Sequence, residues 1–248
     1  MQEATTHGES IRCTARPSFG RAGAAVAAVA LALACGADAA VVTRWNFNNR
    51  SMSATTGTGL ASVLRTTHSG YVAGAPQDGT AASNRSLRVG GFSATPGAPR
   101  GVQFRADVTG YKDVRVTYWQ LNDRSSSRWM QVQYSLNGRA FTSAGLAGGG
   151  RYQFLQAGAF LRKTFAIPGT GALDAVESLR FRVVALPAPG TNRFAGTVGP
   201  YRPTGMWRFD LVTVTGTSIG GADASTPTPG CLSLLGLAGV MQGRRRRS

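Results

Sequence analysis

Few side chains in the middle of this sequence are suited to acid–base or nucleophilic catalysis. Residues 40–219 contain no cysteine and one histidine, His68, which lies in a stretch rich in Ser, Thr and Gly. A hydrolase needs an activated nucleophile, or an acid and a base within reach of each other. The acidic residues show no paired spacing, and most of them flank turns, where Asp bonds its own backbone. They are Asp78, Asp107, Asp113, Asp123, Asp174, Glu177 and Asp210. The sequence also lacks zinc-ligand spacing and a phosphate-binding glycine loop, so we expect no enzyme and no cofactor.

Aromatic and amide side chains point to binding instead. Trp119 and Trp129 lie at solvent-facing positions of two expected strands that flank Asn122–Ser127. If these strands pair as a hairpin, the two indoles lie opposite each other. The polar residues expected beside them are Arg115, Gln131 and Gln133. Flat rings next to amide and guanidinium donors suit a sugar, which has an apolar face and a polar rim. The alternative is that the loop Gly145–Leu161 covers this face and buries both indoles.

Calcium is the one metal that the sequence suggests. Jelly-roll modules often join their first and last strands through a calcium ion with oxygen ligands. Asn46, Asn48 and Asp210 lie on the expected first and last strands. The favoured alternative is that Asp210 forms an ion pair across the sheet with Arg208 or Arg182.

The elements that would position these residues are short strands. Apolar and polar residues alternate in 114–119, 129–134 and 179–185, which is typical of strands with one buried face. In the last expected strand, 206–215, the apolar phase shifts after Leu211, which predicts a β-bulge or burial on both faces. With turn signals between the strands, the sequence predicts an all-β, antiparallel, jelly-roll-like β-sandwich over residues 40–219.

The N-terminal segment 1–39 is typical of a secretory signal peptide with a short apolar helix. Three arginines precede the apolar run Ala24–Ala34, and Ala37 and Ala39 supply the small residues that signal peptidase recognises. The run spans only about half of a bilayer core of roughly 30 Å, which argues against a permanent anchor. A retained anchor and a lipoprotein lipidated at Cys35 are the alternatives.

The C-terminal segment resembles a stop-transfer signal. A Ser/Thr/Pro linker, 220–229, leads to a tail, 230–248, in which the apolar run Cys231–Met241 is expected to form a short helix. The tail ends in a basic cluster formed by Arg244, Arg245, Arg246 and Arg247. Transient membrane insertion of this tail would leave the arginines in the cytoplasm and the domain outside. The alternative is a disordered tail.

The order of these features is similar to the PEP-CTERM sorting signal of exported bacterial proteins. The proline motif would be Pro227, Thr228, Pro229 and Gly230, which lacks the usual glutamate. The resemblance covers about 20 residues and implies cleavage by an exosortase-type membrane protease. The middle of the chain resembles uncharacterised β-sandwich regions of such proteins, and this implies fold and location only. The matching segments are Val42–Asn48, Gly101–Thr142, Leu179–Gly190 and Gly205–Gly216.

The sequence is strongly basic, with a formal net charge of +16. This charge indicates either attraction to polyanions or a general use of arginine, and the scattered placement favours the second, with no specific nucleic-acid partner. We therefore expect an exported cell-surface or extracellular-matrix protein. It would meet the export machinery, signal peptidase and the exosortase, and it would bind extracellular polysaccharide. A purely structural or adhesive component, or a secreted hydrolase or nuclease-like enzyme, are the alternatives.

Overall fold

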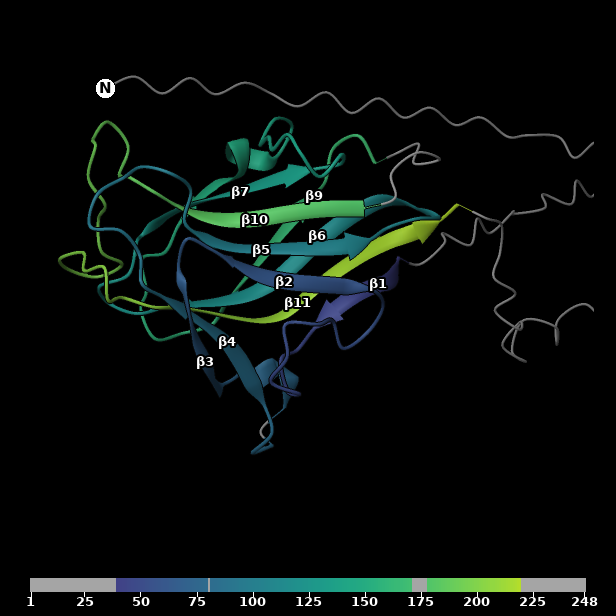
Figure 1. Ribbon diagram of the computed structural model, residues 1–248, viewed down its shortest axis with the longest axis horizontal. Helices are drawn as coiled ribbons and strands as arrows, with labels where there is room; N and C mark the ends of the chain where they lie inside the picture. Colours follow the sequence, from purple (N-terminus) through teal and green to yellow (C-terminus); the bar gives the residue numbers. More distant parts are fainter. Residues whose placement is uncertain (1–38, 80, 171–177, 220–248) are drawn as a thin grey trace, which may run out of the picture. The chain divides into compact units, whose positions relative to one another are not determined.

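The described chain is built from β-strands. A computed structural model describes residues 39–79, 81–170 and 178–219, which form two antiparallel sheets (Figure 1). Sheet A contains β1 (Ala40–Trp45), β3 (Thr67–Ala73), β4 (Arg85–Gly90), β6 (Tyr111–Asn122), β9 (Leu161–Ala166) and β11 (Trp207–Ser218). Sheet B contains β2 (Gly59–Leu64), β5 (Gly101–Asp107), β7 (Trp129–Ser135), β8 (Arg151–Gln153) and β10 (Ser178–Leu186). Two 3₁₀ turns, η1 (Pro76–Asp78) and η2 (Ala147–Gly150), complete the described elements.

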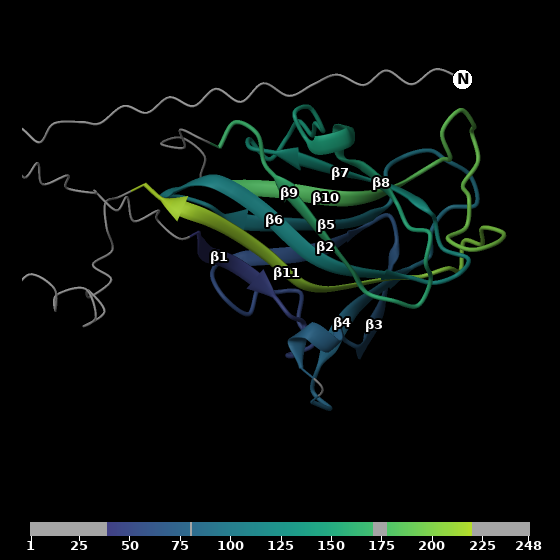
Figure 2. The ribbon, with the colours of Figure 1, turned by 180° about the vertical axis from the view of Figure 1, so that it is seen from behind.

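The strand order is that of a jelly roll. From β4 onward the chain behaves as one long hairpin that has been rolled up, because β4 pairs with β11, β5 with β10, β6 with β9 and β7 with β8. The rolled hairpin gives the orders β4-β11-β6-β9 and β5-β10-β7-β8 in the two sheets. The prediction of an antiparallel jelly-roll sandwich is confirmed. Sheet B faces the viewer in Figure 1, and sheet A faces the viewer in Figure 2.

The core lies between the two sheets and is rich in aromatic rings. Phe104 of β5 packs against Phe181 of β10 within sheet B, with ring centroids 5.0 Å apart. It also reaches Trp45 of β1 at 5.3 Å and Phe209 of β11 at 6.3 Å, both in sheet A. All four side chains are buried. Burial of such large apolar surfaces is the main force that holds the sheets together.

The last strand contains the predicted irregularity. The register of β11 against β6 shifts between Asp210 and Thr213, and Leu211 has a φ of 46°. A positive φ on a non-glycine residue fits a bulge, in which the strand carries an extra residue. Leu211 and Val212 are both buried, so the phase shift has both of the expected causes.

Most of the two terminal segments lies outside the described residues. The predicted signal cleavage residue Ala37, the linker and the sorting tail lie outside the described residues, and Ala39 is exposed just before β1. No helix among the described residues is both long enough and apolar enough to cross a membrane.

Candidate functional site

Trp119 and Trp129 do not form one platform, and the predicted hairpin is wrong. Trp119 lies on β6, which pairs with β11 and β9 in sheet A. Trp129 lies on β7, which pairs with β10 and β8 in sheet B. The segment between them crosses from one sheet to the other and forms backbone hydrogen bonds with Ala195 and Thr197 instead of closing a hairpin. The alternation of apolar and polar residues showed which side of each strand faces solvent, but it carries no information about the partner strand.

The predicted binding residues are therefore divided between two outer faces. Arg115 shares the outer face of sheet A with Trp119, and Gln131 and Gln133 share the outer face of sheet B with Trp129. Both indoles are half-buried rather than covered. The segment named in the alternative, Gly145–Leu161, contains η2 and β8, and β8 extends sheet B beside β7.

On sheet B the amide side chains belong to an oriented network. Gln133 accepts a hydrogen bond from Nε of Arg182 at 2.7 Å and donates to Oε1 of Gln131 at 2.9 Å. Gln131 in turn donates to Oγ of Ser143 and to the carbonyl of Gly149, each at 3.0 Å. The donors of Gln131 are used inside the protein, so its role is to hold Gln133 in place.

Arg182 is the residue at the end of this network, and sequence analysis missed it as a site residue. Its guanidinium group lies over the ring of Phe141, 4.0 Å from the centroid. Burial lowers the pKa of Arg182 below its ordinary value. Alternation along β10 places Arg182 on the outer face, but no local pattern relates it to Gln133 on another strand or to Phe141 in a loop.

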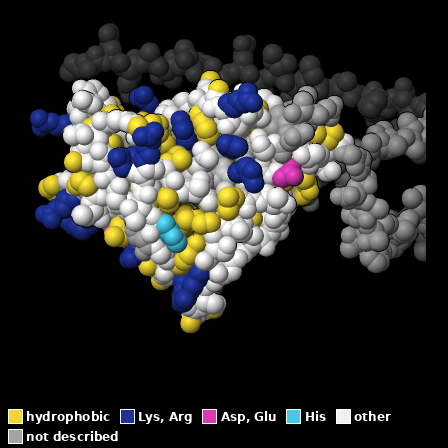
Figure 3. All heavy atoms as spheres, in the orientation of Figure 1, with side chains coloured by type: hydrophobic (Ala, Val, Ile, Leu, Met, Phe, Trp, Pro, Cys, Tyr) yellow, Lys and Arg dark blue, Asp and Glu magenta, His cyan; other side chains and the backbone are white. Residues whose placement is uncertain are grey.

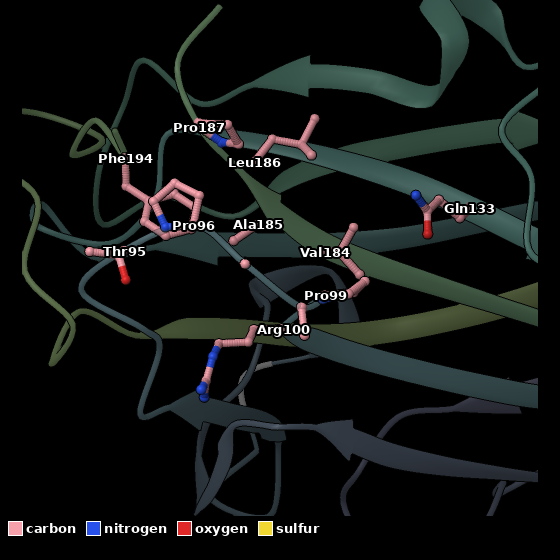
Figure 4. A pocket seen from close by; sticks show the side chains of 12 residues that line it. Thr95, Pro96, Pro99, Arg100, Gln133, Val184, Ala185, Leu186, Pro187 and Phe194 are labelled. Atoms are coloured by element: carbon pink, nitrogen blue, oxygen red, sulfur yellow. The ribbon is translucent and has the colours of Figure 1, made fainter. Parts of the chain in front are cut away.

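A shallow cavity lies beside this network, on the same face. Its volume is about 110 Å³, and Gln133 forms part of its wall. Phe194, Pro96 and Pro187 gather at one end of the cavity and Gln133 lies at the other (Figure 4). Apolar residues make up most of the lining, although polar atoms expose nearly as much of its surface as apolar atoms do. The volume is too small for an oligosaccharide, so it suits the edge of a chain that lies across the sheet.

The outer face of sheet B is also basic. Arg105, Arg180 and Arg182 lie on the outward positions of β5 and β10, and Arg151 lies on β8. Figure 3 shows this face, over which Lys and Arg side chains are spread with few acidic ones. Asp107, at the end of β5, is the one acidic residue in the described strands of sheet B. It accepts a hydrogen bond from the backbone N–H of Thr109 at 3.0 Å, as expected for an Asp beside a turn.

The three predicted calcium ligands do not bind a common partner. Asn46 accepts a hydrogen bond from the backbone N–H of Asn48 at 3.3 Å. Asn48 accepts from the N–H of Arg85 and donates to Asp78, each at 2.7 Å. Among the described residues no group of three or more His, Cys, Asp or Glu side chains is arranged to hold a metal ion.

Asp210 is buried in sheet A under the segment that follows β3. Its carboxylate accepts hydrogen bonds from the backbone N–H groups of Ala75 at 2.6 Å and Leu211 at 2.7 Å. Burial raises the pKa of Asp210 to about 7, and these two hydrogen bonds partly oppose the rise. The expected ion pair with Arg208 or Arg182 is absent, since the ion pair found among the described residues joins Arg44 to Asp78, 3.1 Å apart.

A second buried oxygen faces Asp210. Oδ1 of Asn84 has no hydrogen-bond partner among the described residues. The amide cannot simply be flipped, because its Nδ2 donates to the carbonyls of Ala75 and Gly79. A Cβ atom on Gly74 would lie 1.8 Å from this oxygen and 2.6 Å from Oδ2 of Asp210. The two acceptors therefore lie near each other on the same side of Gly74.

His68 lies on β3, and its ring packs edge-on against Tyr71 with centroids 4.8 Å apart. It is exposed, and no described cluster joins it to two acidic residues. The absence of a catalytic group remains a prediction from the sequence.

Comparison with known proteins relates the chain to solved structures only. No family model and no curated protein matches the sequence. The xylan-binding domain CBM22-2 of Xyn10C from Paenibacillus barcinonensis is 17% identical, with a TM-score of 0.40 over 70% of this chain and 98% of that domain. The mannan-recognising module TmCBM27 is 11% identical, with a TM-score of 0.37 over 73% of this chain and 100% of that module. TmCBM61, solved with β-1,4-galactotriose, is 8% identical, with a TM-score of 0.38 over 68% of this chain and 92% of that module. Likeness at this level assigns neither a family nor a ligand.

Proposed function

We propose that this protein is an exported, non-catalytic module that binds extracellular polysaccharide through the outer face of sheet B. The observation that carries the proposal is the cavity beside the Arg182–Gln133–Gln131 network, where apolar walls and oriented polar groups meet on one solvent-facing surface. Trp129 borders this site, because it lies opposite Leu186 of the cavity wall on the neighbouring strand. Rings and aliphatic walls would contact the apolar face of a sugar, and the amide and guanidinium groups its hydroxyls.

The proposed export rests on the two terminal segments. Residues 1–39 fit a signal peptide that is removed by signal peptidase, and residues 230–248 fit a PEP-CTERM-like tail that an exosortase-type protease would cleave. We infer a location at the cell surface or in the extracellular matrix, with transient membrane attachment through the tail. A polysaccharide partner is consistent with this location.

The two tryptophans provide a matched test of the binding face. We expect the full-length protein to bind a subset of polysaccharides on a glycan array, and Trp129→Ala to weaken that binding about tenfold or more, as loss of a stacked ring of this size would. Trp119→Ala is the control, because Trp119 is half-buried like Trp129 but lies on the other sheet. Near-ultraviolet circular dichroism would show that both variants remain folded.

Two results would count against this proposal. Loss of binding in Trp119→Ala but not in Trp129→Ala would place the site on sheet A. Absence of binding to every glycan by the folded wild type would favour the alternative of a structural or adhesive component.

A further inference from the structure

The outer face of sheet B contains two facing arginines that no ion pair among the described residues neutralises. Arg105 and Arg180 lie directly opposite each other on β5 and β10. Like charges directly opposite each other destabilise a sheet. Nε of Arg180 is also buried without a hydrogen-bond partner among the described residues. Sheet A has a comparable pair, Arg88 and Arg208, and Nε of Arg208 is likewise buried without a hydrogen-bond partner among the described residues, so the pair alone does not distinguish sheet B.

Arg182 adds a third positive charge to this pair, and its position is fixed. It lies two residues beyond Arg180 on the same face of β10, a distance of about 7 Å along the strand. Gln133 binds its Nε atom and Phe141 covers one side of its guanidinium plane. The hydrogen bond to Gln133 uses Nε and not the two Nη atoms, so the edge with these atoms can meet a ligand. A guanidinium group held in this way suits a planar anion, because two parallel N–H groups match the two oxygens of a carboxylate.

The cavity and the arginines are adjacent parts of one surface. Gln133 is shared, since it lines the cavity and also binds Arg182. Val184, the next outward residue of β10 after Arg182, lies in the cavity wall. Arg100, the residue before β5, also lines the cavity (Figure 4). A sugar chain with one unit at the cavity would therefore bring a neighbouring unit over Arg182.

From this arrangement we propose that the ligand is an acidic polysaccharide, and that Arg182 binds the carboxylate of a uronic acid unit next to the unit seated at the cavity. The inference rests on the polysaccharide-binding function proposed above and adds the chemical class of the ligand. Arg105 and Arg180 provide the surrounding positive field, which attracts the polymer and explains why the repulsion between them is tolerated. Functional sites are the places where proteins accept such local conflicts.

The test compares polymers and variants in affinity gel electrophoresis of the full-length protein. The acidic polymers are polygalacturonate and alginate, and a neutral galactan serves for comparison. We expect Arg182→Gln to weaken binding to the acidic polymers at least tenfold, about 1.4 kcal/mol, and to weaken binding to neutral galactan much less, because a hydroxyl accepts a weaker hydrogen bond from a guanidinium group than a carboxylate does. Arg182→Lys should resemble Arg182→Gln, because lysine keeps the charge but loses the planar fork and the stacking on Phe141.

The control variant is Arg162→Gln, which removes an exposed charge from β9 on the opposite sheet. It should bind every polymer as the wild type does. Equal weakening by Arg162→Gln and Arg182→Gln would show attraction by net charge alone and would overturn the inference. Double-stranded DNA and dextran sulfate provide a second check. If either binds as tightly as the acidic polysaccharides or more tightly, and this binding does not depend on Arg182, the inference is also overturned.

The outcomes also separate this inference from the proposed function. Binding to neutral and acidic polymers with equal affinity, lost in Trp129→Ala but not in Arg182→Gln, would overturn the acidic ligand and retain the polysaccharide-binding site. Failure of the folded wild type to bind any of the polymers would overturn both. If Arg182→Gln does not fold, Arg105→Gln tests the same field from an exposed position on β5, and it should weaken acidic binding severalfold.

Discussion

Asp210 gives the stability of this domain an unusual dependence on pH. Because burial raises its pKa from 3.8 to about 7, the folded protein holds the Asp210 proton more tightly than the unfolded chain does. The resulting stabilisation is full below the unfolded pKa and is lost as the pH rises through about 7. We expect the wild type to lose about 2 kcal/mol of unfolding free energy, relative to Asp210→Asn, between pH 5 and pH 8. Urea unfolding of both proteins at several pH values would measure this, and parallel pH profiles would contradict it.

The calcium site predicted from the sequence would have the opposite signature. Calcium needs the ionised carboxylate, so stabilisation by the ion would grow as the pH rises. Sequence reasoning named Asp210 as a calcium ligand or one half of an ion pair because of its place on the last strand, and it did not predict the burial that raises its pKa. It could not select Asn84 as the residue that faces it, since a loop brings these two residues together from positions far apart in the chain.

At the scale of elements, the two sheets are joined by a buried polar link as well as by the core. The hydroxyl of Tyr152 on β8 donates to Oε1 of Gln120 on β6 at 2.9 Å. It therefore accepts the hydrogen bond from the hydroxyl of Tyr118, also on β6, at 2.8 Å. Gln120 and Tyr118 are both buried, and burial raises the pKa of Tyr118 and Tyr152 above the ordinary value.

Tyr152→Phe tests the importance of this link. The substitution would leave Oε1 of Gln120 and the hydroxyl of Tyr118 without a hydrogen-bond partner in the core, which costs about 1–3 kcal/mol, while Nε2 of Gln120 keeps its bond to Asn122. We expect the variant to melt several degrees below the wild type in a thermal scan. Tyr71→Phe is the control, because it retains the ring contacts of Tyr71 with Phe47 and His68, and it should melt within about one degree of the wild type. Equal melting temperatures for all three proteins would show that water replaces the lost hydrogen bonds.

The elements also show how far sequence reasoning reaches. The alternation in β6, β7 and β10 identified the strands and their buried sides, because side-chain direction is a local property with a period of two residues. The phase shift at Leu211 identified the bulge for the same reason. Strand pairing is a long-range property, so the assumed hairpin of β6 and β7 was wrong, and with it the shared face of Trp119 and Trp129. The cavity was not predictable, since it needs the loops before β5 and after β10 to meet.

At the scale of the whole molecule, the first and last strands of the described domain pair with each other, and this bears on export. Ala40 pairs with Gly216, so β1 completes the sheet beside β11, and Trp45 fills the core. Signal cleavage after Ala39 would leave β1 whole, whereas cleavage a few residues later would remove core-filling residues at a cost of several kcal/mol. We therefore expect the intact mass of protein recovered outside its native host cells to correspond to a chain that begins at Ala40 and lacks the terminal arginines. A processed chain that begins after Trp45, or a full-length mass found in the cytoplasmic fraction, would refute this account of export.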